Sequence, residues 1–275
     1  MRTLGGRPMW KWDAEGQPKA VVAIFHSAYE HHAWYAWLIE KLRGSELHVV
    51  MGDLPGHGEQ ATNHRYHDEE FGEYYSYAKR LIQVAQAENL PVFIIGNGLG
   101  ATIAARAIYR HKFECAGLIM VSPWLHLKLE PGKLSKALSS LSAITSNVKL
   151  NHEISYNMLT RNFEVYGEMK DEVPFNTVIT VKWYRQLQQL MRLWKDPEVK
   201  LPDTPILLMT GGRDRITDVK ASKQWLMHQD VKHFQYREWK DGLNSLFFEM
   251  EREEAFQLTK DFMNNSLRSL GYIVK

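Results

Sequence analysis

A short glycine-rich turn, Gly96-Asn97-Gly98-Leu99-Gly100, follows an apolar run over residues 92–95 and leads into a helix-like segment over residues 99–109. In the Gly-x-Ser-x-Gly form of such a turn, the strand bends sharply into the helix and raises a serine for nucleophilic attack. Gly98 stands at the raised position, so no hydroxyl is present there to form an acyl-enzyme. Because glycine tolerates a positive φ, we expect the turn to keep its shape without a nucleophile.

The 12 histidines raise the question of a metal site. Six of them cluster after the first two apolar runs: His26, His31, His32, His57, His64 and His67. Their spacing does not match a helix-borne His-Glu-x-x-His site, and a single cysteine cannot supply the cysteine pair of a zinc cage. The chain also has no Gly-rich phosphate motif ending in Lys-Ser or Lys-Thr. We therefore expect no metal and no cofactor.

Cys115 is the only cysteine, which excludes an intrachain disulfide and a thiolate metal cluster. It opens an apolar run over residues 115–121, so a buried structural thiol is expected rather than a catalytic one. The lone thiol is consistent with a reducing compartment.

The charge balance excludes some partners. Lys and Arg number 34 against 32 Asp and Glu, and the net charge is +2. Because the basic residues are scattered, nothing favours a nucleic acid or an anionic membrane surface as a partner. The N-terminus has no apolar signal-peptide core, and no run approaches the length of about 18 apolar residues that a membrane span needs. We expect a cytoplasmic protein without an integral membrane segment.

The chemistry-bearing turn is embedded in alternating apolar runs and helix-like segments. Continuous apolar character is typical of strands that are covered on both faces, as in a parallel sheet. The predicted strands are residues 20–25, 47–51, 92–95, 118–121, 206–209 and a more exposed 234–239. The predicted core helices are residues 33–42, 71–85, 99–109 and 253–270. This order favours a doubly wound α/β fold that binds ligands at the carboxyl ends of its strands.

Residues 124–202 interrupt the alternation. They contain no buried apolar strand, but they show helix-like patterns at 135–148 and 181–194. Such an insertion is too long for an ordinary loop. We therefore predict a helical cap over residues 124–202, inserted between sheet strands of a core formed by residues 1–123 and 203–275, with Trp183, Tyr184 and Trp194 as candidates for an aromatic lining.

Five motifs in chain order resemble a known group of enzymes. They lie at residues 26–31, 52–58, 96–100, 211–218 and 244–249. The second, Gly52-Asp53-Leu54-Pro55-Gly56-His57-Gly58, is similar to an Asp-x-Pro-Gly-His-Gly turn. Together they resemble the α/β-hydrolase superfamily, in its branch of monoacylglycerol lipases and bacterial lysophospholipases (serine aminopeptidase S33-like). The resemblance spans nearly the whole chain and implies the α/β-hydrolase fold.

This resemblance assigns roles around the turn. Gly98 falls on the family's serine nucleophile, and Asn97 falls on the histidine that precedes it. The backbone N–H groups of Ser27 and Leu99 fall on the oxyanion hole, where they could still bind a carbonyl or carboxylate because they do not depend on side chains. His26 belongs to the same crevice as a further candidate binding residue.

The acid and histidine positions follow from the last two motifs. Asp214 keeps the family's acid position, although an acid-loop aspartate can also simply bind its own loop backbone. Read without a gap, the last motif places Asn244 on the histidine, and a slip of one residue would place Ser245 there. Neither residue titrates near neutral pH, so neither can act as a general base.

Two of the three triad positions are thus vacated, and removal of even one member leaves only a modest residual rate. The first hypothesis is a catalytically inactive hydrolase that retains a capped acyl- or carbonyl-binding pocket for a lipid-like ligand, or that binds a protein partner. The alternative is a carboxylic-ester hydrolase of the lysophospholipase or monoacylglycerol lipase type, seen as a disabled variant or with a non-standard nucleophile. Non-hydrolytic chemistry such as a lyase reaction is a third hypothesis, but such sites usually retain the histidine.

Overall fold

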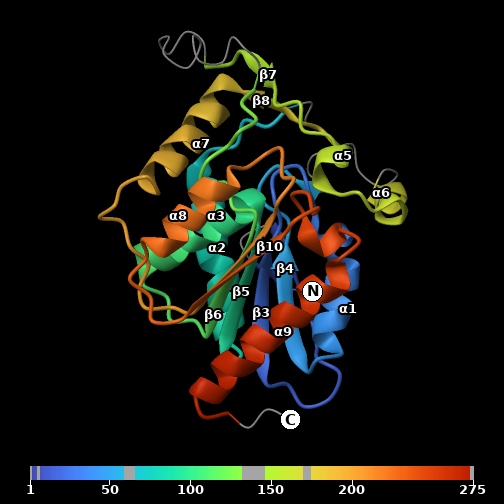
Figure 1. Cartoon of the computed structure of the whole chain (residues 1–275), viewed down its shortest axis with the longest axis vertical. Helices are drawn as coiled ribbons and strands as arrows, with labels where there is room; N and C mark the ends of the chain where they lie inside the picture. The colour runs from blue at the N-terminus through green and yellow to red at the C-terminus, as the bar shows by residue number, and fades with distance from the viewer. Residues whose placement is uncertain (1, 5–6, 59–65, 132–145, 170–174, 273–275) are drawn as a thin grey trace.

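An eight-stranded, mostly parallel sheet forms the centre of the molecule (Figure 1). The computed structural model describes residues 2–4, 7–58, 66–131, 146–169 and 175–272. The strand order is β1-β2-β4-β3-β5-β6-β9-β10. The strands are β1 (Arg2–Leu4), β2 (Arg7–Trp12), β3 (Ala20–Phe25), β4 (Leu47–Gly52), β5 (Val92–Asn97), β6 (Gly117–Val121), β9 (Ile206–Gly211) and β10 (Phe234–Trp239). The strands from β4 to β10 in that order pair parallel with one another, whereas β2 pairs antiparallel with both β1 and β4.

Helices cover both faces of the sheet, which explains the continuous apolar character of the central strands (Figure 1). Every residue of β3, β5, β6 and β9 is buried. Helices α1 (Ala36–Arg43) and α9 (Arg252–Ser269) pack together through Trp37 and Phe256 on one face. Helices α2 (Phe71–Gln86) and α3 (Gly98–His111) pack against each other and against β3 and β5. The α/β-hydrolase fold and the six predicted strands are confirmed.

Two predictions at the N-terminal end differ from the structure. The predicted helix 33–42 begins as a 3₁₀ turn, η1 (His32–Tyr35), before α1 starts at Ala36. Strand β2 was not predicted, because its sequence Arg-Pro-Met-Trp-Lys-Trp alternates and lacks the continuous apolar run of a central strand. It lies near the edge of the sheet, where Met9 is buried but Trp10 and Trp12 are only partly covered.

The insertion between β6 and β9 is mixed rather than purely helical. Its described elements are β7 (Lys149–Asn151), α5 (Tyr156–Leu159), α6 (Phe163–Met169), β8 (Val178–Thr180) and α7 (Val181–Leu193). Two short strands that were not predicted occur here: β7 and β8 form an antiparallel pair of three residues each, too brief to give the apolar run of a buried strand. Helix α7 is confirmed, whereas most of the predicted helix 135–148 falls outside the described residues.

The position of this insertion suggests its role. Its elements lie at one end of the sheet, at the top of the view in Figure 1. Leu159 O accepts a hydrogen bond of 2.9 Å from Ser245 N, which belongs to the loop after β10. We therefore propose that residues 124–202 are the cap of the core formed by residues 1–123 and 203–275.

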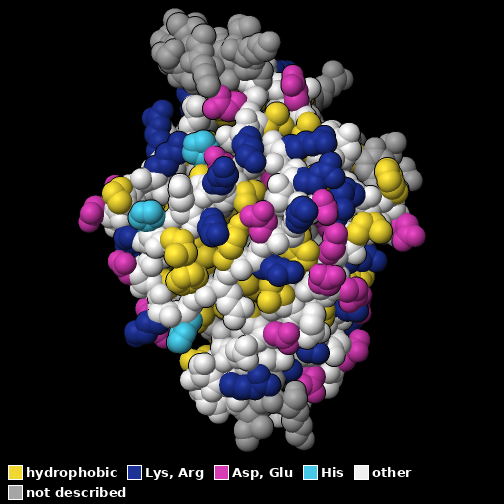
Figure 2. All heavy atoms as spheres, in the orientation of Figure 1, with side chains coloured by type: hydrophobic (Ala, Val, Ile, Leu, Met, Phe, Trp, Pro, Cys, Tyr) yellow, Lys and Arg dark blue, Asp and Glu magenta, His cyan; other side chains and the backbone are white. Residues whose placement is uncertain are grey.

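The surface carries both signs of charge. On the face shown in Figure 2, Lys and Arg side chains are interspersed with Asp and Glu, which agrees with the small net charge of +2. Within the described ranges, every helix is too short or too polar to cross a bilayer.

Candidate functional site

The strand-to-helix turn keeps the shape of a nucleophile elbow. Strand β5 ends at Asn97 in an extended conformation, and α3 begins directly at Gly98, which has a φ of +49°. A β-carbon at Gly100 would lie 2.5 Å from the carbonyl oxygen of Phe25, so the backbones of α3 and β3 approach too closely for any other residue. The turn is therefore built as expected, without the strain of a non-glycine residue at position 98.

The side chain of Ser27 occupies the space above Gly98. A β-carbon at position 98 would overlap Ser27 Oγ and would lie 2.8 Å from Ser27 Cβ and 3.0 Å from Trp124 Nε1. Ser27 Oγ accepts a hydrogen bond of 3.3 Å from the backbone N–H of Leu99. A serine hydroxyl is thus present at the elbow after all, but it comes from the loop after β3.

Both backbone donors assigned to the oxyanion hole are already engaged. The Leu99 N–H points to Ser27 Oγ, and the Ser27 N–H donates to Glu30 Oε2 at 2.8 Å. The expectation of two free donors therefore differs from the structure. The reason is local: Ser27 has a side chain where the family motif has glycine, and Glu30 folds back three residues along the same loop.

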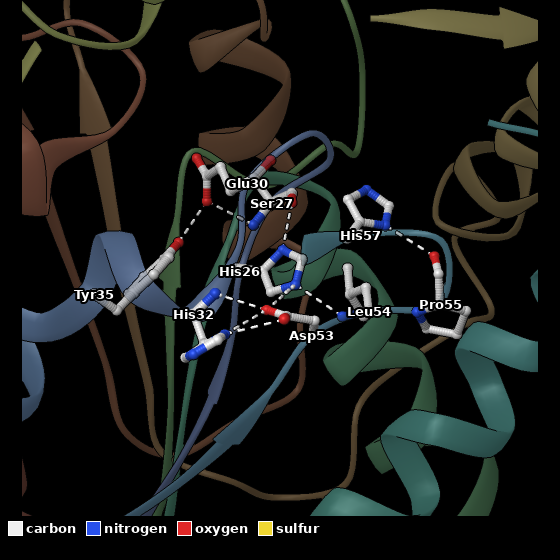
Figure 3. A network of polar contacts seen from close by, with 9 residues as sticks. All are labelled: His26, Ser27, Glu30, His32, Tyr35, Asp53, Leu54, Pro55 and His57. Atoms are coloured by element: carbon white, nitrogen blue, oxygen red, sulfur yellow. Dashed lines mark hydrogen bonds and ion pairs between the residues drawn. The ribbon is translucent and has the colours of Figure 1, made fainter. Parts of the chain in front are cut away.

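Glu30 joins three of the motif loops, and Figure 3 shows its hydrogen bonds to Ser27 and Tyr35. Its buried carboxylate accepts hydrogen bonds from four groups, with the oxygen–donor distances in parentheses: Ser27 N (2.8 Å), Tyr35 OH (2.6 Å), Asn97 Nδ2 (2.9 Å) and Ser245 Oγ (3.4 Å). Burial raises the pKa of Glu30 above its usual value, although these hydrogen bonds oppose the shift. Glu30 was not among the predicted site residues, although its place within the 26–31 motif was a signal.

Asn244, which the motif order places at the histidine position, faces the acid of the predicted site. Its Nδ2 donates to Asp214 Oδ2 at 2.9 Å, and this contact favours Asn244 over Ser245 as the residue that faces the acid. Asp214 Oδ1 accepts from the backbone N–H groups of Ile216 (2.7 Å) and Thr217 (3.0 Å). Asp214 thus also binds its own loop, as the simpler interpretation anticipated.

Ser245 and Asn97 face the carboxylate of Glu30 instead. Asn97 Nδ2 also lies 3.3 Å from Ser245 Oγ, and both side chains are buried. Asn97 therefore connects the elbow to the loop after β10, and the geometry assigns it a structural contact.

His26 links the loop after β3 to the loop after β4 (Figure 3). Its Nε2 accepts from Leu54 N at 2.8 Å, so its Nδ1 carries the proton and donates to Ser27 O at 2.7 Å. Burial lowers the pKa of His26 to about 4, so the ring is neutral at physiological pH. Because both nitrogens are committed within the chain, the prediction of His26 as a ligand-binding residue differs from what the structure shows.

The other histidines near the crevice are also structural. His32 donates its backbone N–H to Asp53 Oδ1 at 2.7 Å, and hydrogen bonds from His32 lower the pKa of Asp53 although burial opposes this. Burial lowers the pKa of His57 well below its usual value. Among the residues that the structure describes, no three His, Cys, Asp or Glu side chains form a group that could hold a metal ion.

Tyr29 fills the space between the elbow loop and the proposed cap. Its φ is +71°, a rare conformation for a bulky residue, and its ring is buried. Its hydroxyl lies 2.7 Å from Nδ1 of His152, a residue of the insertion, and its ring lies beside those of Trp124 and Trp183. Aromatic side chains therefore pack where core and insertion meet.

A second contact ties the insertion to the loop after β10. The Arg161 guanidinium binds the buried Glu249 (Nε–Oε1, 3.3 Å) and the half-buried Glu251 (Nη2–Oε2, 2.6 Å). Glu249 also accepts from Leu243 N at 2.8 Å. The loop that carries Asn244 is thus held at both of its ends.

A family model and several known proteins match most of this chain. A family model described as serine aminopeptidase, S33, matches residues 16–251. Phospholipase YtpA of Bacillus subtilis is 34% identical over 256 residues, which cover 92% of this chain and 98% of that protein. Human monoglyceride lipase is 26% identical over 257 residues, which cover 87% and 83%.

Solved structures agree on the fold. The monoacylglycerol lipase of Paleococcus ferrophilus superposes with a TM-score of 0.75 at 22% identity, covering 94% of this chain and 99% of that one. A soluble variant of Saccharomyces cerevisiae monoglyceride lipase, in complex with a substrate analogue, gives a TM-score of 0.80 at 16% identity, covering 96% and 94%.

Proposed function

The chain belongs to the serine aminopeptidase S33 family of hydrolases, and from that premise we propose that it is a catalytically inactive member of the monoacylglycerol lipase and lysophospholipase type. The observation that carries the proposal is the elbow itself. Gly98 offers no nucleophile, and the hydroxyl of Ser27 fills the space in which a side chain at position 98 would stand.

The acid–base part of the machinery supports the same proposal. Serine is a weak nucleophile unless an adjacent base takes its proton. Asn244 faces Asp214 in the position of the base, and an amide cannot take up a proton at neutral pH. The residual rate that an open oxyanion hole could supply is also reduced, because the N–H groups of Ser27 and Leu99 are engaged.

Any ligand of this crevice would be held through its apolar part. The aromatic side chains around Tyr29, including Trp124 and Trp183, favour an acyl chain or another lipid-like group. A carbonyl or carboxylate would first have to displace the Ser27 hydroxyl from Leu99 N–H. We therefore place ligand binding in the apolar contacts rather than in the oxyanion hole.

The second candidate function is an ester hydrolase with a relocated nucleophile, and Ser27 is the residue that favours it. Its Oγ lies at the elbow, next to the first turn of α3. However, across the described part of the chain, its only hydrogen-bond partner is the Leu99 N–H, which is not a base. We therefore rank this function below the inactive one.

Activity-based labelling separates the two candidates. The unmodified chain is treated with a fluorophosphonate probe and assayed on p-nitrophenyl butyrate and a monoacylglycerol. We expect neither labelling nor turnover. Labelling that disappears in Ser27→Ala would overturn the proposal in favour of the relocated nucleophile.

A reconstructed site provides the positive control. Gly98→Ser alone is expected to stay silent, because Ser27 blocks its side chain and no base is present. The triple variant Ser27→Gly, Gly98→Ser, Asn244→His restores nucleophile, space and base together, and we expect it to react with the probe. Matched thermal melting of each variant shows whether silence reflects chemistry or unfolding.

A further inference from the structure

A cavity separate from the elbow is lined by residues of helix α8 (Val219–Met227) and of the loop after α7. Both elements lie on the left of Figure 1. The volume of the cavity is about 350 Å³. Ala221, Gln224, Trp225 and His228 line it, at the spacing of one helix face and its continuation. None of the residues of the elbow, of the acid loop or of the vacated histidine position belongs to its lining.

Two tryptophans form an aromatic wall of this cavity. The rings of Trp194 and Trp225 lie 5.8 Å apart at an interplanar angle of 90°, and both side chains are more than nine-tenths buried. The indole Nε1 of each, and Nδ1 of the lining residue His126, have no hydrogen-bond partner within the described chain. A buried N–H without an acceptor costs free energy, so the two indole donors would gain from a ligand that carries acceptor oxygens.

The charged side chains that line the cavity are mainly positive, which suits a ligand with acceptor oxygens. Lys195 and Lys200 line it, and Asp196 is its only lining carboxylate. Lys195 forms no ion pair with the described residues, whereas the Lys200 ammonium donates to the backbone carbonyl of His228. Asp196 Oδ1 accepts from Glu198 N at 3.0 Å, so this carboxylate is engaged in its own turn.

From this combination we propose that the cavity binds a small molecule with a flat aromatic body and a carboxylate or similar anionic group. The volume is at the lower end of small-molecule sites, which span about 300–1,000 Å³. The aromatic ring of the ligand contacts the edges and faces of the two tryptophans. Lys195 and the unpartnered indole donors bind its anionic group. This proposal does not depend on whether the elbow is active.

Three matched probes test the chemistry. Equilibrium dialysis measures the binding of 1-naphthoate, 1-naphthalenemethanol and 1-naphthylmethylamine, which share one ring system and differ in charge. We expect 1-naphthoate to bind most tightly and the amine most weakly. If none binds at millimolar concentration, or if the amine binds as tightly as the carboxylate, the proposal is wrong.

Variants localise the binding. Lys195→Gln should weaken 1-naphthoate by about fivefold, as expected for one exposed ion pair, and leave 1-naphthalenemethanol unchanged. Lys220→Gln is the matched control, since Lys220 is an exposed lysine of α8, whose neighbouring residue Ala221 lines the cavity while Lys220 itself does not. Ala221→Trp should fill the cavity and abolish binding of both probes, with folding verified by thermal melting. Unchanged binding in Lys195→Gln and Ala221→Trp, or an equal loss in Lys220→Gln, would overturn the assignment to this cavity.

Discussion

Ser27 Oγ lies in the space that a β-carbon at Gly98 would need. The family motifs have glycine at position 27 and serine at position 98, so the two residue types are exchanged in this chain. Ser27 can point at the elbow because position 98 has no side chain, and Gly98 cannot be replaced while Ser27 points there. The two positions are therefore sterically coupled, and this coupling explains how the elbow remains packed without a side chain at position 98.

This exchange predicts energetic coupling. Gly98→Ser should destabilise the protein by about 2 kcal/mol, because it overpacks a buried site and places a side chain at positive φ. Adding Ser27→Gly should recover much of that loss. Urea unfolding of the two single variants and the double variant gives the coupling free energy. If the two effects are simply additive, the steric relation between the residues is not what keeps Gly98 in place.

The contact between Asn244 and Asp214 makes a second prediction. Asn244→Asp replaces a donor with a carboxylate beside Asp214, in a buried site, so two like charges meet. We expect a loss of about 2 kcal/mol at pH 7 that becomes smaller at pH 4, where one carboxyl is protonated. Thermal melts at both pH values measure it. Asn265→Asp, at an exposed position beside Arg268, is the control and should have little effect.

Two buried histidines predict the acid limit of stability. Burial lowers the pKa of both His26 and His152 to about 4, below the ordinary histidine value of 6.5. The folded state therefore binds fewer protons than the unfolded state between these pH values, and stability must fall as the pH drops from 6.5 towards 4. Each histidine should contribute about 2 kcal/mol to this loss.

The raised pKa of Glu30 acts in the opposite direction, since its protonation favours the folded state. Comparing a histidine variant with the unmodified chain cancels this contribution of Glu30. His152→Gln should flatten the curve of melting temperature against pH, whereas His233→Gln, at an exposed position, should leave it unchanged. A curve of equal steepness in the His152→Gln variant would show that His152 is not neutral in the folded state.

Arg161 should hold the insertion to the loop that carries Asn244. Arg161→Ala leaves the carboxylate of Glu249 buried with backbone donors only, and we expect a loss of about 2 kcal/mol. Hydrogen exchange should speed up at residues 159–161 and 243–249 together, because Ser245 N and Thr160 Oγ1 bridge the same two segments. Arg43→Ala breaks an exposed pair with Glu40 within one helix and should change neither region. Exchange that speeds up in only one segment would argue against the clamp.

The motif spacing predicted most of the site's location. Residues 96–100, 214 and 244 were placed from the order of motifs, and the structure builds 96–100 as a strand-to-helix turn and brings Asn244 into contact with Asp214. The insertion was less predictable, since β7 and β8 have three residues each and leave no periodic signal. The role of Glu30 was also missed, because two of its four donors, Asn97 and Ser245, come from distant parts of the chain.

By itself, the sequence determined which chemical groups are absent: a glycine has no hydroxyl and an asparagine has no titratable ring, whatever surrounds them. Only the tertiary structure decided what takes their place. The hydroxyl of Ser27 meets the Leu99 N–H, and the carboxylate of Glu30 meets the Ser27 N–H, because the loop after β3 folds back over the start of α3. Such hydrogen bonds join residues up to 72 positions apart, and residue types alone do not specify which donors a buried acceptor will find.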